Sequence, residues 1–417
     1  MRRPDLPGNE DDKGIIAPPP SSWLNHNVLG ISLTSLFSDM SHEMATSILP
    51  FFILAVGGNA ATVGLVEGAS DGSSSLVKSY SGYYSDKSGK RTPIMYLGYL
   101  LTTLLIPAIG FVTSWVEVLA LRMGAWMGRG ARGPPRDALL VDSIPPGTTG
   151  KAFGLERTFD TVGAVIGPAI ALFLIPYISL SQIFFVSFIP GVVCMACVVF
   201  LVRDVGRRSW GGRTSREGEG RSFFSSVMSL PKNFRVFLLS VGLFGVANFS
   251  NVIFTLRAEQ VLLPSLGARA ASEFAVSLYL VLNVTYALGS FPAGYFADRT
   301  SKRNLLALGY FVFALACFAS VFETTNVAIL LTIFILAGLQ TAIVDTVERA
   351  YASDLIGDPA LKGTGFGVLQ TVNGVGDFVS STMIGVLWTV LSPAVGFGTV
   401  ASLAILSSAL LLLMFKR

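Results

Sequence analysis

The sequence has 417 residues, of which 52% are hydrophobic and only 13% are charged. Soluble domains carry about 25% charged residues, so this composition excludes an ordinary soluble protein and requires much of the surface to face lipid. The net charge of +4 is small, and the positions of the charges along the chain are more informative. Because a membrane-spanning helix takes about 20 apolar residues, a dozen spans would use nearly the whole chain.

In chain order, residues 1–25 are polar and rich in proline, and they show no apolar core followed by a cleavage site. We therefore expect a cytoplasmic tail and no cleavable signal peptide. Apolar segments follow, interrupted by a polar, Arg-rich segment at 203–233. We predict an all-α membrane protein with a tail at 1–25, a six-helix bundle at 26–202, a cytoplasmic central loop at 203–233 and a second six-helix bundle at 234–417. The predicted spans are 26–50, 60–84, 93–113, 116–141, 151–175, 182–202, 234–257, 274–297, 304–322, 327–352, 364–388 and 393–415.

The Lys and Arg residues indicate the orientation of these spans. The N-terminal tail, every second loop and the C-terminus together hold 21 of the 30 Lys and Arg residues, whereas the alternate loops hold only Arg269. Loops rich in Lys and Arg remain on the cytoplasmic side of the membrane. The sequence therefore predicts a plasma-membrane protein, in the inner membrane if the cell is Gram-negative, with both termini in the cytoplasm.

The two halves of the chain resemble each other at a nearly constant spacing. The segment from Gly82 to Lys87 (GYYSDK) matches the segment from Gly294 to Arg299 (GYFADR), at a shift of 212 residues. Phe153-Gly154 and Phe366-Gly367 open the predicted fifth and eleventh spans at a shift of 213. Two six-span repeats of the same topology predict a substrate site between the halves, near the middle of the membrane.

The segment from Gly82 to Arg91 (GYYSDKSGKR) resembles the signature that the major facilitator superfamily carries between helices 2 and 3. A second copy runs from Gly294 to Arg303, with Ser301 in place of the last glycine, and the likeness covers residues 26–415. The resemblance implies two pseudo-symmetric six-helix bundles that latch at a cytoplasmic gate. We assign to this gate Gly82, Asp86, Lys87, Gly89, Arg91, Gly294, Asp298 and Arg299, together with Arg136, Asp137, Asp345, Glu348 and Arg349 of helices 4 and 10.

The fifth span carries a partial match to a second motif. The segment from Gly163 to Pro168 (GAVIGP) resembles the Gly-x-x-x-Gly-Pro core that exporters of the family carry, although Ala171-Leu172 replace the Gly-Gly that usually follows. The resemblance slightly favours efflux. The alternative is that these residues only let helix 5 pack closely or bend.

Charged residues inside predicted spans give the candidate site. Such groups are costly in hydrocarbon, so they usually face the interior of the bundle and serve function. Predicted spans 3, 6, 9 and 12 have no charged residue in their apolar cores, as expected for the outer helices of the family fold. We place the following residues on a substrate and proton pathway: Asp39, His42, Glu43, Glu67, Asp71, Arg122, Trp126, Arg129, Asn248, Asn251, Asn373 and Asp377.

Spacing suggests separate roles within this set. Asp39 and Glu43 share a face about 18–24 Å into helix 1, where they would carry protons, with His42 as a possible shuttle. Arg129, near the middle of helix 4, would meet an anionic substrate or neutralise a carboxylate of helix 1. Glu67 and Asp71 of helix 2 would take part in transport or simply pair with arginines, and the residues alone leave both readings open.

The sequence thus predicts a secondary transporter, not an enzyme, that moves a small organic molecule by alternating access, with protons as the coupling ion. The basic residues of helix 4 favour an anionic or metal-chelating substrate. We expect a monomer in the lipid bilayer, with no cofactor, no bound metal and no nucleic-acid partner. Importers and uniporters of the same fold, and a non-transporting sensor or lipid-handling relative, stay open as alternatives. An ATP-driven pump is disfavoured because no GxxxxGK[ST] loop is present.

Overall fold

The computed structural model describes residues 22–88, 91–145, 148–205, 230–356 and 362–413. In the first half, the sixth span is divided by a local irregularity at Ser187. The elements are α1 (His26–Ala55), α2 (Ala60–Ser88), α3 (Thr92–Ala108) continued by the 3-10 turn η1 (Ile109–Phe111), α4 (Trp115–Asp142), α5 (Thr149–Leu174), α6 (Leu180–Val186) and α7 (Phe188–Leu201).

The second half repeats this pattern, with its first span in two pieces. The elements are α9 (Lys232–Gly245), α10 (Val252–Leu266), α11 (Ala268–Arg299), α12 (Lys302–Val321), α13 (Val327–Ile356), α14 (Lys362–Val390) and α15 (Pro393–Leu413). Counting α6 with α7 and α9 with α10, the described residues form twelve helical spans, and each predicted span overlaps one of them. The all-α, twelve-helix prediction is confirmed. Most of the predicted central loop, residues 206–229, lies outside the described residues, so the domain boundary there stays a prediction.

The seventh span corrects one detail of the prediction, which placed a continuous helix over 234–257. The structure instead interrupts the span at residues 246–251 and then continues it as α10 to Leu266. The interruption contains Asn248, Ser250 and Asn251. Such side chains offer backbone groups alternative hydrogen bonds and so favour a break in the helix.

Hydropathy divides the spans into two groups. Within the described residues, seven spans are long and apolar enough to cross a membrane by length and composition alone. The other spans are α1, α2, α4, α14 and the interrupted pair α9 and α10. These spans carry most of the candidate site: α1, α2, α4 and α14 hold its polar and charged residues, and α9 and α10 are each too short to be counted alone.

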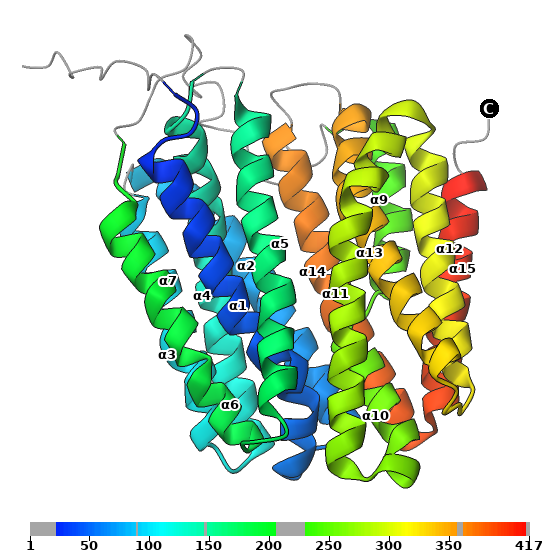
Figure 1. The fold of residues 1–417 in the computed structure, drawn as a ribbon. Helices are drawn as coiled ribbons and strands as arrows, with labels where there is room; N and C mark the ends of the chain where they lie inside the picture. The colour runs from blue at the N-terminus through cyan, green and yellow to red at the C-terminus, as the bar shows by residue number, and fades with distance from the viewer. Residues whose placement is uncertain (1–21, 89–90, 146–147, 206–229, 357–361, 414–417) are drawn as a thin grey trace, which may run out of the picture.

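The spans lie side by side, with α1–α7 on one side of the molecule and α9–α15 on the other (Figure 1). Helix α1 begins and α15 ends at the upper end of the bundle in this view, which we call the terminal end, the opposite end being the far end. The two halves meet where α2 packs against α14 and α5 packs against α11. Near the far end, the backbone of Gly385 lies so close to Ala60 that a Cβ at Gly385 would come within 2.5 Å of the Ala60 carbonyl oxygen.

The two glycines of the helix 5 motif have a packing role in the structure. Gly163 and Gly167 bring α5 against α1, where a Cβ at Gly167 would lie 2.6 Å from the carbonyl oxygen of Met40, and one at Gly163 would collide with that of Leu36. Small residues at such crossings let membrane helices approach closely. The packing alternative that the sequence left open therefore accounts for both glycines.

This crossing gives a first testable prediction. We expect Gly163→Ala to destabilise the protein by about 1–3 kcal/mol, the usual penalty for overpacking, because the added methyl group meets backbone atoms that cannot move aside. Gly154→Ala, in the same helix, is the control, since a Cβ there meets nothing within 4 Å. Equilibrium unfolding in detergent micelles measures both variants. Equal stabilities would show that the crossing tolerates a wider separation.

Candidate functional site

Arg129 of α4 lies at the centre of a buried polar cluster. Its guanidinium donates a hydrogen bond to Nε2 of His42 and lies 3.7 Å from a carboxylate oxygen of Asp39, both on α1. The Asp39 side chain is 8% exposed, whereas that of Arg129 is 34% exposed. Arg129 is therefore the partly exposed partner of a buried carboxyl group.

The contacts of His42 define its protonation state. Arginine has no acceptor, so Nε2 of His42 must accept the hydrogen bond from Arg129, and the proton of the neutral ring then sits on Nδ1. Nε2 also lies 3.3 Å from Glu43. The ring packs against Trp126 with the ring centroids 4.3 Å apart.

Asp39 has a second partner that the sequence did not reveal. The carboxyl group of Asp160 on α5 is its neighbour, and Asp160 forms an ion pair of 3.0 Å with Arg157. Two adjacent negative charges disfavour each other, so a proton on either carboxyl group would relieve their repulsion. Arg157 and Asp160, three residues apart on one helix, were the signal in the sequence that could have found this pair.

A second buried ion pair joins α2 and α4. Arg122 donates to Glu67 at 3.0 Å, and the two side chains are 0% and 5% exposed. Arg122 also donates to the hydroxyl of Thr46 at 3.1 Å, and its guanidinium carbon lies 3.3 Å from the centre of the Trp126 ring. Trp126 in turn donates from its indole nitrogen to Asp71 at 2.9 Å. Glu67 thus pairs with an arginine, which is one of the two alternatives that the sequence left open. Asp71 instead accepts a hydrogen bond from a tryptophan.

Two hydrogen bonds connect carboxylates of the first half, Glu67 and Glu43, with the second half of the molecule. The hydroxyl of Ser250, in the interruption between α9 and α10, donates to Glu67 at 2.7 Å. The hydroxyl of Tyr279 on α11 donates to Glu43 at 2.9 Å. The two halves are thus joined at the site by hydroxyl–carboxylate contacts, neither of which the sequence analysis included.

The interruption itself is held by α13 and α14. Ser380 donates to the backbone oxygen of Asn248 at 2.7 Å, and Asn251 donates to Thr341 at 3.4 Å. The side chain of Asn248 accepts a hydrogen bond from Gln340 of α13 at 3.4 Å. Asn373, on the same helix as Asp377, donates instead to Glu348 at 2.6 Å. The predicted residues of the second half therefore lie together around an interrupted helix, a feature that in transporters marks binding sites.

The predicted gate is described only in part. Gly89 lies outside the described residues. The structure also leaves undescribed the surroundings of Gly82 and the side chains of Asp86, Lys87 and Asp298. Arg136 pairs with Glu156 at 2.8 Å and with Asp137 at 3.0 Å, and Asp345 accepts a hydrogen bond from Tyr286 at 3.2 Å. Of the other gate residues, Arg91 pairs with Asp142, and Gly294 faces Thr346. Arg299 lies over the ring of Tyr295, and Arg349 is exposed.

The chain matches the family model described as Major Facilitator Superfamily over residues 31–266 and 239–417. It is 32% identical over 391 residues to MJ1317 of Methanocaldococcus jannaschii, an uncharacterized MFS-type transporter, covering 93% of this chain and 95% of that protein. It is 24% identical over 331 residues to the cis,cis-muconate transport protein of Acinetobacter baylyi, covering 76% of each.

Among solved structures, that of the nucleoside transporter NupG superimposes with a TM-score of 0.79 at 11% sequence identity, covering 94% of this chain and 99% of that one. This likeness extends the match from sequence to the arrangement of all the spans. The family resemblance that the repeated Gly82 and Gly294 segments suggested is confirmed, and the chain belongs to the major facilitator superfamily.

Proposed function

We propose that this protein is a proton-coupled secondary transporter of a small organic anion. One observation carries the proposal: the buried carboxyl group of Asp39 lies 3.7 Å from the partly exposed cation Arg129, with the acid Asp160 as its other neighbour. A carboxyl group in this position can release its proton and pair with Arg129, or keep the proton and leave Arg129 available to another anion. Protonation and substrate binding are thereby linked at one guanidinium.

The position of Arg129 supports an anionic substrate. At 1.5 Å per residue it lies about 21 Å into α4, close to the middle of the helix, and it is the partly exposed member of the cluster. A guanidinium recognises carboxylates through paired hydrogen bonds. The relative from Acinetobacter baylyi is named for cis,cis-muconate, which is a dicarboxylate, and this agrees with a carboxylate as the group that Arg129 would bind.

The arrangement of the halves supports alternating access. They pack closely near the far end, where Arg269 of α11 donates to the carbonyl oxygen of Ile175 and where Ala60 meets Gly385. Nearer the terminal end, Asp345 and Arg349 are exposed within their span and Asp137 is half-buried. With the terminal end in the cytoplasm, as the Lys and Arg distribution predicts, this is an inward-facing state in the plasma membrane.

The direction of transport is a separate prediction. Because protonated Asp39 leaves Arg129 to the substrate, a proton and an anion would occupy the site together and travel in the same direction. The efflux that the helix 5 motif slightly favours loses support, since the packing of Gly163 and Gly167 on α1 already accounts for that motif.

The test is a flux measurement in liposomes with a pH dye in the lumen and a panel of mono- and dicarboxylates outside. We expect one class of carboxylate to drive proton movement in the native protein and Asp39→Asn to abolish that movement. Asp204→Asn, which removes an exposed carboxylate just after α7, should behave like the native protein.

Each alternative has its own outcome in this assay. Substrate movement without protons would point to a uniporter or to another coupling ion. Proton movement that survives in Asp39→Asn would remove Asp39 from the coupling site and leave Glu43, Asp71 and Asp377 as candidates. Flux of neutral compounds alone would contradict the anionic substrate.

A further inference from the structure

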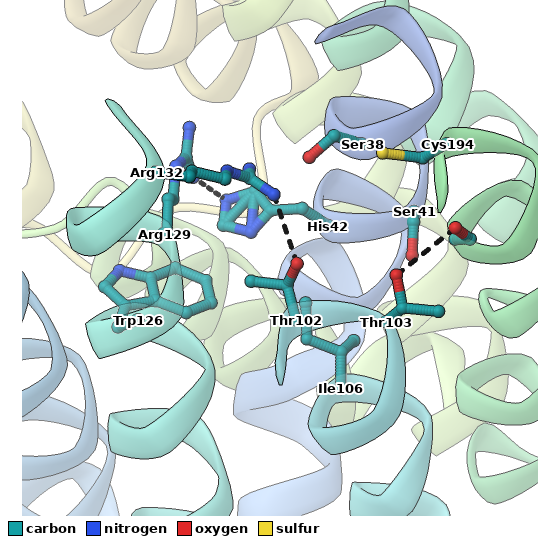
Figure 2. Close-up of a pocket in the computed structure, with 11 residues that line it drawn as sticks. Ser38, Ser41, His42, Thr102, Thr103, Ile106, Trp126, Arg129, Arg132 and Cys194 are labelled. Carbon is teal, nitrogen blue, oxygen red and sulfur yellow. Dashed lines mark hydrogen bonds between the residues drawn. The ribbon is translucent and has the colours of Figure 1, made fainter. Parts of the chain in front are cut away.

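A small cavity lies inside the first half of the molecule, next to the site described above, and shares Arg129 and His42 with it (Figure 2). Its walls come from four spans of this half, with Ser38 and His42 on α1, Thr102 on α3, Arg132 on α4 and Cys194 on α7. The centre of a water-sized sphere can move through about 10 Å³ within it. This is room for one water molecule or one monatomic ion, and not for an organic molecule.

Arg132 brings a positive charge to the wall of this cavity. The residue is 5% exposed. Its side chain donates to Thr102 at 3.1 Å and lies 4.2 Å above the centre of the Tyr99 ring. The other three arginines of α4 each pair with a carboxylate, but Arg132 forms no ion pair with any carboxylate of the described residues. A buried charge without a counterion is strongly unfavourable.

His42 adds a second group that lacks a partner. Because its Nε2 accepts from Arg129, the ring carries its proton on Nδ1. Nδ1 is buried and has no hydrogen-bond partner within the described residues, although burying such a donor alone costs about 1–3 kcal/mol. One wall of the cavity therefore holds an unbalanced cation and another holds an unused N–H donor.

We propose that this cavity binds a chloride ion. Arg129 is paired with Asp39, whereas Arg132 forms no ion pair within the described residues, and a single monovalent anion beside it would neutralise its charge. A water molecule could satisfy the hydrogen bonds but not the charge. The size of the cavity excludes polyatomic anions such as sulfate or gluconate. This cavity adjoins the proposed transport site through Arg129 and His42, but the chloride proposal rests on Arg132 and does not depend on the transport proposal.

The ion would nevertheless act on its neighbours. Arg129 lines the cavity and also contacts Asp39, so an anion beside Arg132 lies next to the group that we propose to bind substrate. It would offset the repulsion between the two guanidinium groups and stabilise the bundle of α1, α3, α4 and α7.

The experiment measures thermal unfolding of the purified protein in lipid nanodiscs at constant ionic strength, with sodium gluconate replaced stepwise by chloride, bromide or sulfate. We expect a saturable rise of a few degrees with chloride and bromide and none with sulfate. Arg132→Gln should abolish this rise. Arg269→Gln, which removes an exposed arginine at the far end, should keep it.

A second variant leaves all the charges in place. Gly191 lines the cavity, and a Cβ there would lie 3.2–3.5 Å from Thr103 and Ser41, so Gly191→Ala reduces the room with little other change. We expect this variant to fold and to need at least several-fold more chloride for half of the effect. It keeps the proposal testable if Arg132→Gln does not fold.

Bromide, located by its anomalous scattering in a crystal, should appear between Arg132 and His42. Identical melting temperatures in chloride, gluconate and sulfate would overturn the proposal and leave the cavity to a water molecule. A chloride effect that persists in Arg132→Gln would overturn it as well, because the ion would then bind elsewhere.

Discussion

Replacing Arg129 by glutamine is expected to abolish carboxylate transport at ordinary substrate concentrations. Removing one partner of a buried hydrogen-bonded charge pair costs about 2–5 kcal/mol, and each 1.4 kcal/mol is a tenfold change in affinity. We therefore expect the concentration for half-maximal transport to rise by at least tenfold in liposomes. Arg129→Lys keeps the charge but loses the paired geometry of the guanidinium. Its concentration for half-maximal transport should lie between those of the native protein and of Arg129→Gln.

The control for this prediction is Arg235→Gln, which removes an exposed arginine of α9. Its transport should equal that of the native protein. If Arg129→Gln kept the native affinity but no longer moved protons, Arg129 would act only on Asp39 and another residue would bind the substrate.

Replacing Arg122 by methionine is expected to lower the free energy of unfolding more than Gly163→Ala or Arg269→Gln. The change leaves Glu67 as a buried carboxylate that keeps only the hydrogen bond from Ser250, and breaking a buried ion pair from one side costs about 3–5 kcal/mol. Unfolding in detergent micelles measures this loss. Removing the exposed ion pair of Arg269 with Glu273, through Arg269→Gln, should cost no more than about 1 kcal/mol.

The double variant Arg122→Met, Glu67→Gln separates the pair from the packing around it. With both charges gone, we expect most of the lost stability to return, because no unpaired charge is left in the interior. A double variant as unstable as Arg122→Met alone would show that the contacts of the guanidinium with Thr46 and Trp126, and not the ion pair, hold this part of the protein.

Much of the fold could be predicted from the sequence, because a membrane span is a local property. Twenty apolar residues are visible in any one segment, and the shift of 212 residues between GYYSDK and GYFADR showed the duplication. The interruption at 246–251 was missed, since Asn248 and Asn251 lie within a segment that is otherwise apolar enough to continue as a helix.

The site was predicted less completely, because ion pairs join helices that are distant in the sequence. Arg122, Arg129 and Arg136 recur every seven residues and so share one face of α4, but in the structure they pair with carboxylates of three different helices, α2, α1 and α5. Sequence periodicity cannot distinguish these destinations, which depend on how neighbouring helices are rotated. Asp160 was overlooked for the same reason.

The contact between Asn251 and Thr341 has a counterpart in the first half of the molecule. At the shift of 212, these residues correspond to Asp39 and Arg129, so the second half holds an uncharged copy, 3.4 Å long, of the ion pair in the first. Asp71 likewise corresponds to Asn283. At this helix crossing, the second half therefore packs through a neutral hydrogen bond where the first half has an ion pair, so close packing of these two spans does not by itself require charge.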